Sequence, residues 1–325
     1  MQNNKIRWGI ISTGTIAGQF CADMSFVNNG ELVAVGARNI ENARSFADKY
    51  NITNAYEGYQ SVYDDPNVDI VYVATPHNFH FENVRDALMA GKHVVCEKPI
   101  TVSPEESKQL FELAKEKKLF LMEAMWTFFL PAIIQAKQWV EEGRIGKIKQ
   151  IKADFGYPMP YQLESRVYRE DLAGGCLLDM GIYPLAISTF FTEKTIENVY
   201  VKPQFAPNGV EDDLIILAES GDVHLTLGTS FQCKLHNWAV IIGEQGSIVI
   251  PDFWRASSCE LYHSDNLVDS FQDNRTSQGL NYEAQAAGEA VLAKKLEHEQ
   301  MPHAVSQELQ EQLARVKSKY KKLAI

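Results

Sequence analysis

The sequence has 325 residues, with 31 Lys and Arg against 42 Asp and Glu, a formal net charge of −11, and 45% hydrophobic residues. At about 150 residues per domain, this length predicts two domains of ordinary globular composition. The negative charge repels phosphate backbones and anionic lipids, so it argues against nucleic acid and membrane surfaces as partners. A small anionic ligand held by a few local positive groups remains compatible with it.

The cysteines and the termini indicate the compartment. The five cysteines are an odd number, widely spaced and without a C-x-x-C pair, which predicts neither a disulfide framework nor a zinc site and suits a reducing cytosol. No uniformly apolar run reaches the roughly 18 residues of a membrane span. The N-terminus enters a strand-like run at once, without the design of a signal peptide. We therefore expect a cytoplasmic protein.

The first third of the chain alternates short apolar runs with helical stretches. A helix is predicted to begin after Ser103, which is suited to be its N-cap, with Pro104 at the first helical position and Glu106 completing a capping box. Strands that are apolar throughout and alternate with helices predict a parallel sheet covered on both faces. The expected strands are 6–11, 32–37, 70–74, 93–96 and 119–122, and the other expected helices are 16–26 and 79–90.

The pattern changes after about residue 125. Several runs there alternate polar and apolar positions, and a plausible hairpin turn at 220–222 joins two of them, which predicts a mainly antiparallel sheet. The fold class is therefore α/β: a Rossmann-type parallel-sheet domain (1–124) followed by an α+β domain with a large open sheet (125–325), whose last helix is a candidate to pack back on the first domain. The expected strands are 148–155, 213–219, 223–231, 238–243 and 247–250, and the expected helices are 133–142, 282–298 and 306–323.

The loop after the first strand has the layout of a dinucleotide fingerprint. In the segment 8–17, WGIISTGTIA, the first glycine of that fingerprint is replaced by Ser12. Such a turn lets backbone N–H groups approach a pyrophosphate at a helix N-terminus, where the helix dipole favours negative charge. A Cβ at Gly14 would obstruct that approach, and Ala17 is small enough for the helix to pack closely on the strand. The alternative is a tight strand–helix turn that binds nothing.

The end of the second strand distinguishes the two nicotinamide cofactors. An NAD site has an acid there, about 20 residues beyond the glycines, that bonds the ribose 2′-hydroxyl. This sequence has Arg38 in the segment VGARN, and a guanidinium pairs with a 2′-phosphate. We therefore expect NADP rather than NAD, the alternative being a surface arginine.

Two further segments carry candidate catalytic groups. Lys98 follows the fourth strand, and the carboxyl ends of parallel strands line the ligand crevice, so its side chain is expected to face the cofactor. Asp179 and Tyr183 lie four residues apart in GGCLLDMGIY, which places them on one face of a helix. His77 and His80 form an H-x-x-H, but a second set of ligands is missing and no metal is expected.

Together these segments resemble a known family. WGIISTGTIA, ATPHNFH, CEKP, LFLMEAMWTFF and GGCLLDMGIY are similar, in order and spacing, to the motifs of the glucose–fructose oxidoreductase/inositol dehydrogenase (Gfo/Idh/MocA) family. The resemblance covers the whole chain and is strongest to the branch of dimeric dihydrodiol dehydrogenases and NADP-dependent D-xylose dehydrogenases. It implies a nucleotide-binding domain, a second domain whose open sheet is often used for dimerisation, and a homodimer or higher homo-oligomer.

The resemblance also implies a reaction. A hydride passes between nicotinamide and a secondary alcohol of a sugar, polyol or cyclic diol, while Tyr183 takes the hydroxyl proton. A free tyrosine titrates near 10, so an acid/base at neutral pH needs help of about 4 kcal/mol, part of which the Lys98 ammonium supplies. Asp179 is expected to position Lys98 or the substrate. The reverse assignment, with Lys98 as proton carrier and Tyr183 as orienter, stays open.

The remaining expectations concern binding residues. Trp126 is expected to form a wall of the substrate pocket or to be a core residue, and Arg166 to contact a cofactor phosphate or to stabilise its loop. Phe128 and Ala186 depart from the patterns of related sequences, which leaves the substrate open. A second function, a non-catalytic NADP(H)-sensing protein of the same fold, need not retain Lys98, Asp179 and Tyr183 together. The expected cofactor-binding residues are Ser12, Thr13, Gly14, Thr15, Ile16, Arg38, Thr75, Pro76, His77, His80, Glu97, Lys98 and Arg166.

Overall fold

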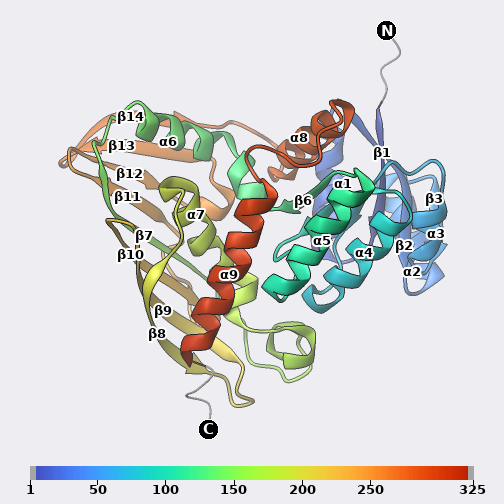
Figure 1. Cartoon of the computed structure of the whole chain (residues 1–325), viewed down its shortest axis with the longest axis horizontal. Coiled ribbons are helices and arrows are strands. Elements are labelled where there is room, and N and C mark those ends of the chain that lie inside the picture. The colour runs from blue at the N-terminus through green and yellow to red at the C-terminus, as the bar shows by residue number, and fades with distance from the viewer. Residues whose placement is uncertain (1–4, 321–325) are drawn as a thin grey trace. The chain divides into compact units, whose positions relative to one another are not determined.

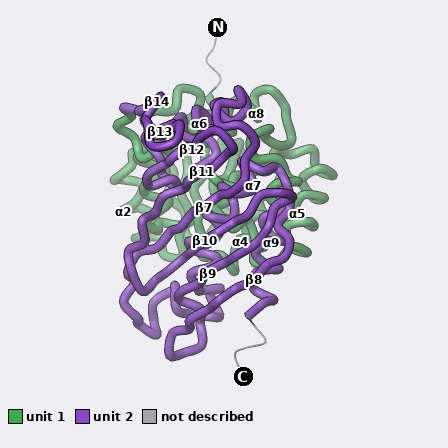
Figure 2. The backbone as a smooth tube through the Cα atoms, turned by 90° about the vertical axis from the view of Figure 1, so that its left-hand side faces the viewer, with its two compact units in different colours: residues 1–126, 275–307 green, residues 127–274, 308–325 purple. Residues whose placement is uncertain are grey.

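The chain divides into two compact units, shown in Figure 1 by element and in Figure 2 by unit. The structure is a computed structural model that describes residues 5–320. Unit 1 contains the chain up to residue 126 together with residues 275–307, and unit 2 contains residues 127–274 and the chain from residue 308 on. The predicted division at 124/125 did not include this return of the chain to unit 1. Residues 321–323 of the predicted last helix lie outside the described residues.

Unit 1 is built on a six-stranded sheet in the order β3-β2-β1-β4-β5-β6, in which every neighbouring pair is parallel. The order reverses between β1 and β4, because the chain first adds strands on one side of β1 and then on the other. Its strands are β1 (Ile6–Ile11), β2 (Gly30–Ala37), β3 (Asn54–Glu57), β4 (Ile70–Val73), β5 (His93–Glu97) and β6 (Leu121–Ala124).

Helices cover both faces of this sheet, which explains why the central strands are apolar throughout. Val71 and Val73 of β4 point into a core shared with α3, α4 and α5, whereas Tyr72 points to the other face and stacks on Phe20 of α1 with ring centroids 3.8 Å apart. The helices of this unit are α1 (Thr15–Asp23), α2 (Ile40–Tyr50), α3 (Gln60–Asp64), α4 (His80–Met89), α5 (Pro104–Lys117) and α8 (Leu280–Leu292).

The segment 275–307 is anchored to α1 by a buried carboxylate. Asp23, the last residue of α1, accepts hydrogen bonds of 2.9 Å from the backbone N–H groups of Gln278, Gly279 and Leu280. Leu280 is the first residue of α8 and Gly279 is its N-cap, so these N–H groups precede or begin the helix and have no partner within it. Asp23 therefore holds the start of a helix more than 250 residues away in sequence, and this contact joins α8 to α1.

Unit 2 is built on an eight-stranded sheet in the order β14-β13-β12-β11-β7-β10-β9-β8. The central pair β7–β10 is parallel and the other neighbouring pairs are antiparallel. Its strands are β7 (Ile148–Gly156), β8 (Glu197–Phe205), β9 (Glu211–Ser220), β10 (Val223–Ser230), β11 (Ala239–Gly243), β12 (Ser247–Ile250), β13 (Ser258–His263) and β14 (Asn266–Gln272).

The helices of unit 2 lie on one face of its sheet, and Figure 2 looks onto the strands from the other face. The strands alternate accordingly: Leu214 and Ile216 of β9 are buried, whereas Ile215 and Leu217 are exposed. The helices are α6 (Pro131–Glu141), α7 (Ile182–Thr192) and α9 (His303–Tyr320), of which α9 begins among the residues of unit 1.

The predicted fold class is confirmed, since a parallel Rossmann-type sheet is followed by a large, mostly antiparallel one. Ser103 caps α5 as predicted and accepts a bond from Glu106 N at 3.2 Å, but the Oε2 atom of Glu106 has no hydrogen-bond partner, so the full reciprocal capping box is not seen. Six elements were not predicted: β3, α2, α3, β8, β13 and β14.

One helical stretch, Glu170–Thr192, is long and apolar enough to cross a membrane by length and composition. Of its apolar window, 83% is buried inside the protein. Its apolar character is that of a core helix, and it contains the segment with Asp179 and Tyr183.

Candidate active site

The reversal of strand order in unit 1 brings the predicted nucleotide motifs together. Ile11, Val73 and Cys96, near the ends of β1, β4 and β5, are register partners across the sheet. The loops that carry Ser12, Thr75 and Lys98 therefore leave the sheet side by side at its carboxyl edge. Ligands of open parallel sheets bind at this point of reversal.

The first of these loops holds a non-glycine residue in a glycine conformation. Ser12 has φ of +108°, and its hydroxyl accepts a hydrogen bond of 3.2 Å from Gly14 N. Gly14 and Thr15 are exposed at the N-terminus of α1. A Cβ built on Gly14 would lie 3.4 Å from Ser12 Oγ, which is ordinary contact, so packing within the protein does not require a glycine there. The open N–H groups of α1 fit the pyrophosphate of a dinucleotide.

Arg38 lies where the sequence placed it, immediately after β2. It is exposed and precedes Asn39, whose side chain accepts a bond of 3.1 Å from Asn42 N and caps α2. The strand end of β2 is paired with that of β3 (Ala37 with Glu57), so Tyr59 follows alongside. Burial raises the pKa of Tyr59, and the positive charge of Arg38 opposes that rise, so the two side chains are within electrostatic reach.

The side chain of His80 links the loop after β4 to the loop after β5. Its ring is fully buried, with Nδ1 2.7 Å from Pro99 O and Nε2 2.7 Å from Thr75 O. Carbonyl oxygens only accept, so a neutral imidazole satisfies one of these contacts and an imidazolium satisfies both. The ring of His77 lies 5.7 Å away in an edge-on arrangement. Within residues 5–320, no group of three or more His, Cys, Asp or Glu side chains is placed to hold a metal ion.

Lys98 follows directly on a buried carboxyl group. The hydroxyl of Tyr72 donates to Glu97 Oε1, and Lys98 N lies 3.3 Å from Glu97 Oε2. Glu123, fully buried on β6, accepts a 2.8 Å hydrogen bond from Ile100 N. Burial raises the pKa of Glu123 to about 7, and the positive charge of Lys98 opposes that rise. The positive charge of Lys98 therefore favours the ionised form of Glu123.

A third acid, Glu283 of α8, lies in the same interior. Its side chain is fully buried, and neither carboxyl oxygen has a hydrogen-bond partner. Burial raises its pKa well above the ordinary range, and the negative charges of Glu97 and Asp23 reinforce this shift. The shift favours the protonated form of Glu283, because an unpaired buried charge would carry a large desolvation penalty.

In unit 2, Arg166 and Asp179 form an ion pair. Arg166 Nη2 lies 2.8 Å from Asp179 Oδ1, and the side chain of Asp179 is 17% exposed. Of the two roles expected for Arg166, this contact supports the one in which it fixes its own loop. Gly174 is needed at the end of that loop, because a Cβ there would lie 2.7 Å from Val167 O and 2.8 Å from Arg169 O.

The helix that carries Asp179 and Tyr183 contains a π-helical turn, Leu177–Gly181, before α7 begins at Ile182. Such turns are rare and are frequently found at functional sites. Asp179 lies within the turn and Tyr183 just after it, so the one-face spacing expected from a regular α-helix is modified here.

The Tyr183 ring is held by two aromatic neighbours from elsewhere in unit 2. Phe155 lies edge-on to it with centroids 5.3 Å apart, and Trp254 lies 6.3 Å away. Phe155 and Trp254 are themselves stacked, with centroids 4.8 Å apart and an interplanar angle of 23°. Trp254 O also accepts a 2.8 Å hydrogen bond from Thr127. We call Phe155, Tyr183 and Trp254 the aromatic wall.

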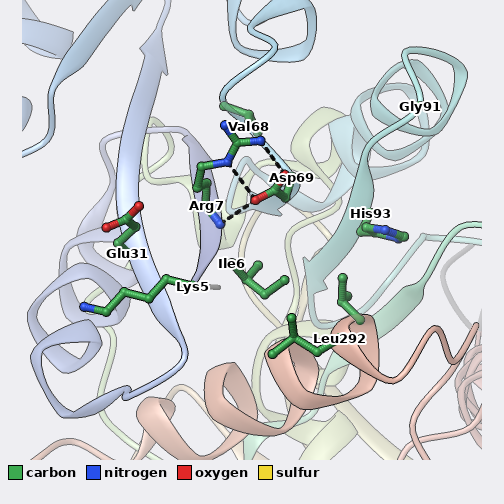
Figure 3. A pocket seen from close by; sticks show the side chains of 10 residues that line it. Lys5, Ile6, Arg7, Glu31, Val68, Asp69, Gly91, His93 and Leu292 are labelled. Atoms are coloured by element: carbon green, nitrogen blue, oxygen red, sulfur yellow. Dashed lines mark hydrogen bonds and ion pairs between the residues drawn. The ribbon is translucent and has the colours of Figure 1, made fainter. Parts of the chain in front are cut away.

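A cavity of unit 1, of about 630 Å³, lies at the opposite, amino-terminal edge of the parallel sheet (Figure 3). Its most prominent charged groups already satisfy one another. Arg7 pairs with Asp69 through its side chain at 2.7 and 2.9 Å and through its backbone N–H at 2.9 Å. The cavity therefore offers no unsatisfied charge from this pair and is distant from the loops of the nucleotide motif.

The chain matches two family profiles. The oxidoreductase family with an NAD-binding Rossmann fold (GFO_IDH_MocA) matches residues 6–125, and the GFO/IDH/MocA C-terminal domain matches residues 133–249. The chain belongs to the GFO/IDH/MocA oxidoreductase family. It is 35% identical over 253 residues to trans-1,2-dihydrobenzene-1,2-diol dehydrogenase of Mus musculus, covering 77% of this chain and 75% of the relative. The Danio rerio protein of the same name is 30% identical over 311 residues, which cover 93% of this chain and 92% of that relative.

Solved structures agree with the family fold. KijD10, a 3-ketoreductase from Actinomadura kijaniata in complex with NADP and TDP-benzene, superposes with a TM-score of 0.87 at 26% identity, covering 97% of this chain and 98% of that one. An aldose-aldose oxidoreductase from Caulobacter crescentus has a TM-score of 0.89 at 19% identity, covering 98% of each chain, which shows the fold alone. NADP, the cofactor predicted from the sequence, is the one present in the KijD10 complex.

The sequence did not single out Phe155 and Trp254 of unit 2 or Glu283 of unit 1. Phe155 ends the predicted strand 148–155 and Glu283 lies in the predicted helix 282–298, but no local pattern marks these side chains, because their partners come from distant parts of the chain. Trp126 is buried at the end of unit 1, which is compatible with both roles expected for it.

The backbone of Ser12 generates the first testable prediction. A side chain at φ of +108° costs about 1–3 kcal/mol, which glycine avoids. We expect Ser12→Gly to raise the free energy of unfolding by about 1 kcal/mol after the lost hydroxyl contact and the greater freedom of the unfolded chain are counted. Urea unfolding followed by circular dichroism measures it. Ser12→Ala is the control, because it removes the hydroxyl and keeps the strain; equal stabilities of the two variants would show that Ser12 is not strained.

Proposed function

We propose that this GFO/IDH/MocA protein is an NADP-dependent dehydrogenase or reductase that transfers a hydride between nicotinamide and a secondary alcohol of a sugar, polyol or cyclic diol. The observation that carries the proposal is the placement of Lys98 at the carboxyl edge of the parallel sheet, one strand beyond the reversal point. The relatives named as diol dehydrogenases and the ketoreductase neighbour support the reaction class.

The cofactor would be held by groups of unit 1. The N–H groups at the start of α1 face the position of a pyrophosphate, and Gly14 lets it approach. Arg38, exposed at the end of β2, would pair with a 2′-phosphate. The loops containing Thr75 and Pro99, held by His80, complete the edge at which the nicotinamide end would lie. The bound nicotinamide supplies the hydride acceptor or donor.

The protein's own part in the chemistry is proton transfer and orientation. When an alcohol is oxidised, its C–H hydride would leave to the cofactor and its O–H proton would pass to the phenolate of Tyr183, giving the ketone, the reduced cofactor and a neutral tyrosine. The ammonium of Lys98 favours the phenolate form of the tyrosine and orients the substrate hydroxyl. Asp179, held by Arg166, would orient Lys98 or the substrate. Our assignment has Tyr183 as the acid/base, and the exchange of roles with Lys98 is the alternative that the experiment below separates.

The aromatic wall supports a cyclic substrate. Trp254, which is partly exposed, stacks on the buried Phe155 beside the Tyr183 ring and offers an apolar ring face. The apolar face of a sugar or of a cyclic diol packs on such a surface, whereas a short acyclic alcohol would leave it uncovered. We therefore place cyclic compounds before open-chain ones in the substrate class.

The catalytic assignment predicts a loss of turnover in two variants. Lys98→Met removes the ammonium, so we expect no measurable turnover while NADPH still binds. Tyr183→Phe removes the proton carrier, so we expect kcat at neutral pH to fall about 10²- to 10⁴-fold. The measurement is NADP⁺ reduction with pentoses, hexoses, inositols and cyclic diols, with NADPH binding followed by fluorescence.

Two matched controls are Lys108→Met, exposed on α5, and Tyr262→Phe on β13, and both should behave as the unmodified protein. A small effect of Tyr183→Phe beside a large effect of Lys98→Met would assign the proton to Lys98. If the unmodified protein binds NADPH but turns over none of these substrates, the NADP(H)-sensing function takes the place of the enzyme.

The cofactor assignment predicts a change of preference in Arg38→Asp. Loss of a charge-assisted contact and the repulsion of a 2′-phosphate should weaken NADP⁺ binding about 10- to 100-fold, while NAD⁺ binding is unchanged or improved. Titration of both cofactors measures the ratio of dissociation constants. Lys49→Asp, in the last turn of α2, makes the same charge change and should leave the ratio unaltered. An unaltered ratio in Arg38→Asp would mean that the 2′-phosphate is read elsewhere.

We also propose that the open face of the eight-stranded sheet joins two copies of the chain. Tyr200, Ile215 and Leu217 are 62%, 52% and 45% exposed, and the register pairs Tyr200 with Leu217. Large apolar side chains gathered on one sheet face mark an interaction surface. A second copy would present the same face, as a two-fold interface requires.

This proposal predicts that Leu217→Lys lowers the mass in solution to that of a single chain, 36.6 kDa, because each two-fold contact would bury two like charges. Light scattering at several protein concentrations measures the mass. Val102→Lys changes an exposed apolar residue of unit 1 and should leave the assembly intact. An oligomer that persists in Leu217→Lys, or an unmodified protein that is already a single chain, contradicts the proposed interface.

A further inference from the structure

A buried asparagine lies where three chain segments of unit 2 meet. Asn237, just before β11, is fully buried and has φ of +63°, the left-handed conformation that Asn, Asp and Gly tolerate best. It is neither a predicted site residue nor part of the mechanism above. Its hydrogen bonds all go to residues next to the aromatic wall.

Asn237 is bonded on both sides of Phe155. Its backbone N–H donates to Asp154 Oδ1 at 2.6 Å, and its side-chain Oδ1 accepts from Gly156 N at 2.9 Å. The backbone N–H of Asp154 donates in turn to Trp238 O at 3.2 Å. The residues before and after Phe155 are therefore both fixed to the same short segment. Gly156 has little freedom to move, because a Cβ there would lie 2.8 Å from Leu235 Cγ and 2.9 Å from Ser230 O.

Asn237 is also bonded beside Trp254. Its carbonyl oxygen accepts a 3.2 Å hydrogen bond from Phe253 N, and Phe253 is itself fully buried. One residue thus sets the separation of the two segments whose rings stack at 4.8 Å and flank Tyr183. The two segments lie about a hundred residues apart in the sequence, and local structure alone gives no reason for their rings to align.

We propose that Asn237 is a positioning residue for substrate specificity. Through its hydrogen bonds to the Asp154–Gly156 segment and to Phe253, it holds Phe155 and Trp254 as one surface beside Tyr183. This inference rests on the proposed function of the same site. It assigns to Asn237 the preference for a ring-shaped substrate over a short open-chain one, with no direct contact to substrate or cofactor.

The test uses Asn237→Gly in the full-length protein. Glycine keeps the backbone conformation and both backbone hydrogen bonds but removes the Oδ1 acceptor of Gly156 N. We expect KM for a cyclic diol to rise about tenfold with kcat changed less than threefold, and kcat/KM for a short acyclic diol to change less than twofold. NADP⁺ binding should stay the same. A residue that only supports folding would lower the active fraction, and kcat would then fall equally for both substrates with KM unchanged.

Two further variants make the result specific. Asn198→Gly replaces another asparagine of unit 2 with positive φ, 49°, which lies on the edge strand β8 and bonds Glu219 of β9, so KM for the cyclic diol and kcat/KM for the acyclic diol should both be unaltered. Asn237→Asp keeps an acceptor at the Oδ1 position and should restore KM for the cyclic diol to within about threefold of the unmodified value. Equal cyclic-to-acyclic ratios in Asn237→Gly and the unmodified protein would overturn the proposal.

A spectroscopic measurement that needs no turnover tests the positioning role of Asn237 independently of the proposed function. Stacked aromatic rings in a fixed arrangement give near-ultraviolet circular dichroism, so Asn237→Gly should lose intensity there with an unchanged far-ultraviolet spectrum, and Asn198→Gly should lose none. If the unmodified protein turns over no alcohol, the proposed function fails. An unchanged near-ultraviolet spectrum in Asn237→Gly would then overturn the positioning role on its own.

Discussion

The reversal of strand order between β1 and β4 determines where the candidate residues of unit 1 lie. Because β2 and β3 add on one side of β1 while β4, β5 and β6 add on the other, the loops after β1 and β4 leave the carboxyl edge of the sheet at the point of reversal, where open parallel sheets bind their ligands. The register places Ile11 beside Val73, and Val73 beside Cys96. This alignment brings the loops with Ser12, Thr75 and Lys98 to the same edge of the sheet. The charged cavity lies at the other edge, and none of these three residues lines it.

Much of unit 1 can be predicted from the sequence because its signals are local. A buried parallel strand such as β4 is a short apolar run, and the Ser103–Pro104 start of α5 contains its own capping chemistry. The strands of unit 2 that were not predicted lack such signals. Strand β8 contains Pro203 and lies at a sheet edge, and β13 and β14 form a hairpin of mixed polar and apolar residues in which Ser264, rather than glycine, adopts positive φ. Sheet edges are specified by pairing with distant strands, which a short window of sequence does not contain.

The same distinction applies within the site. Ser12, Arg38 and Lys98 are predictable because each comes directly after a strand whose end the sequence marks. The aromatic wall is not, since Phe155, Tyr183 and Trp254 come from a strand, a helix and a short turn that meet only in the folded unit. The signal for Asn237 is weaker still: its role depends on a positive φ and on bonds to residues about 80 positions earlier in the chain. Residues that act by positioning others have no motif of their own.

The interior behind Lys98 also changes the meaning of the net charge. The formal value of −11 counts every carboxyl group as ionised. Burial raises the pKa of Glu283 well above its ordinary range and that of Glu123 to about 7, so both buried acids hold their protons more tightly than an exposed carboxyl group does. The negative charge of Glu97 is one cause of the shift at Glu283, so the acids of this interior disfavour one another's ionisation. The formal count therefore overstates the negative charge of this interior. The net charge of the chain describes its exposed surface rather than this edge of the sheet, where Lys98, Arg38 and the N-terminus of α1 are the local positive groups.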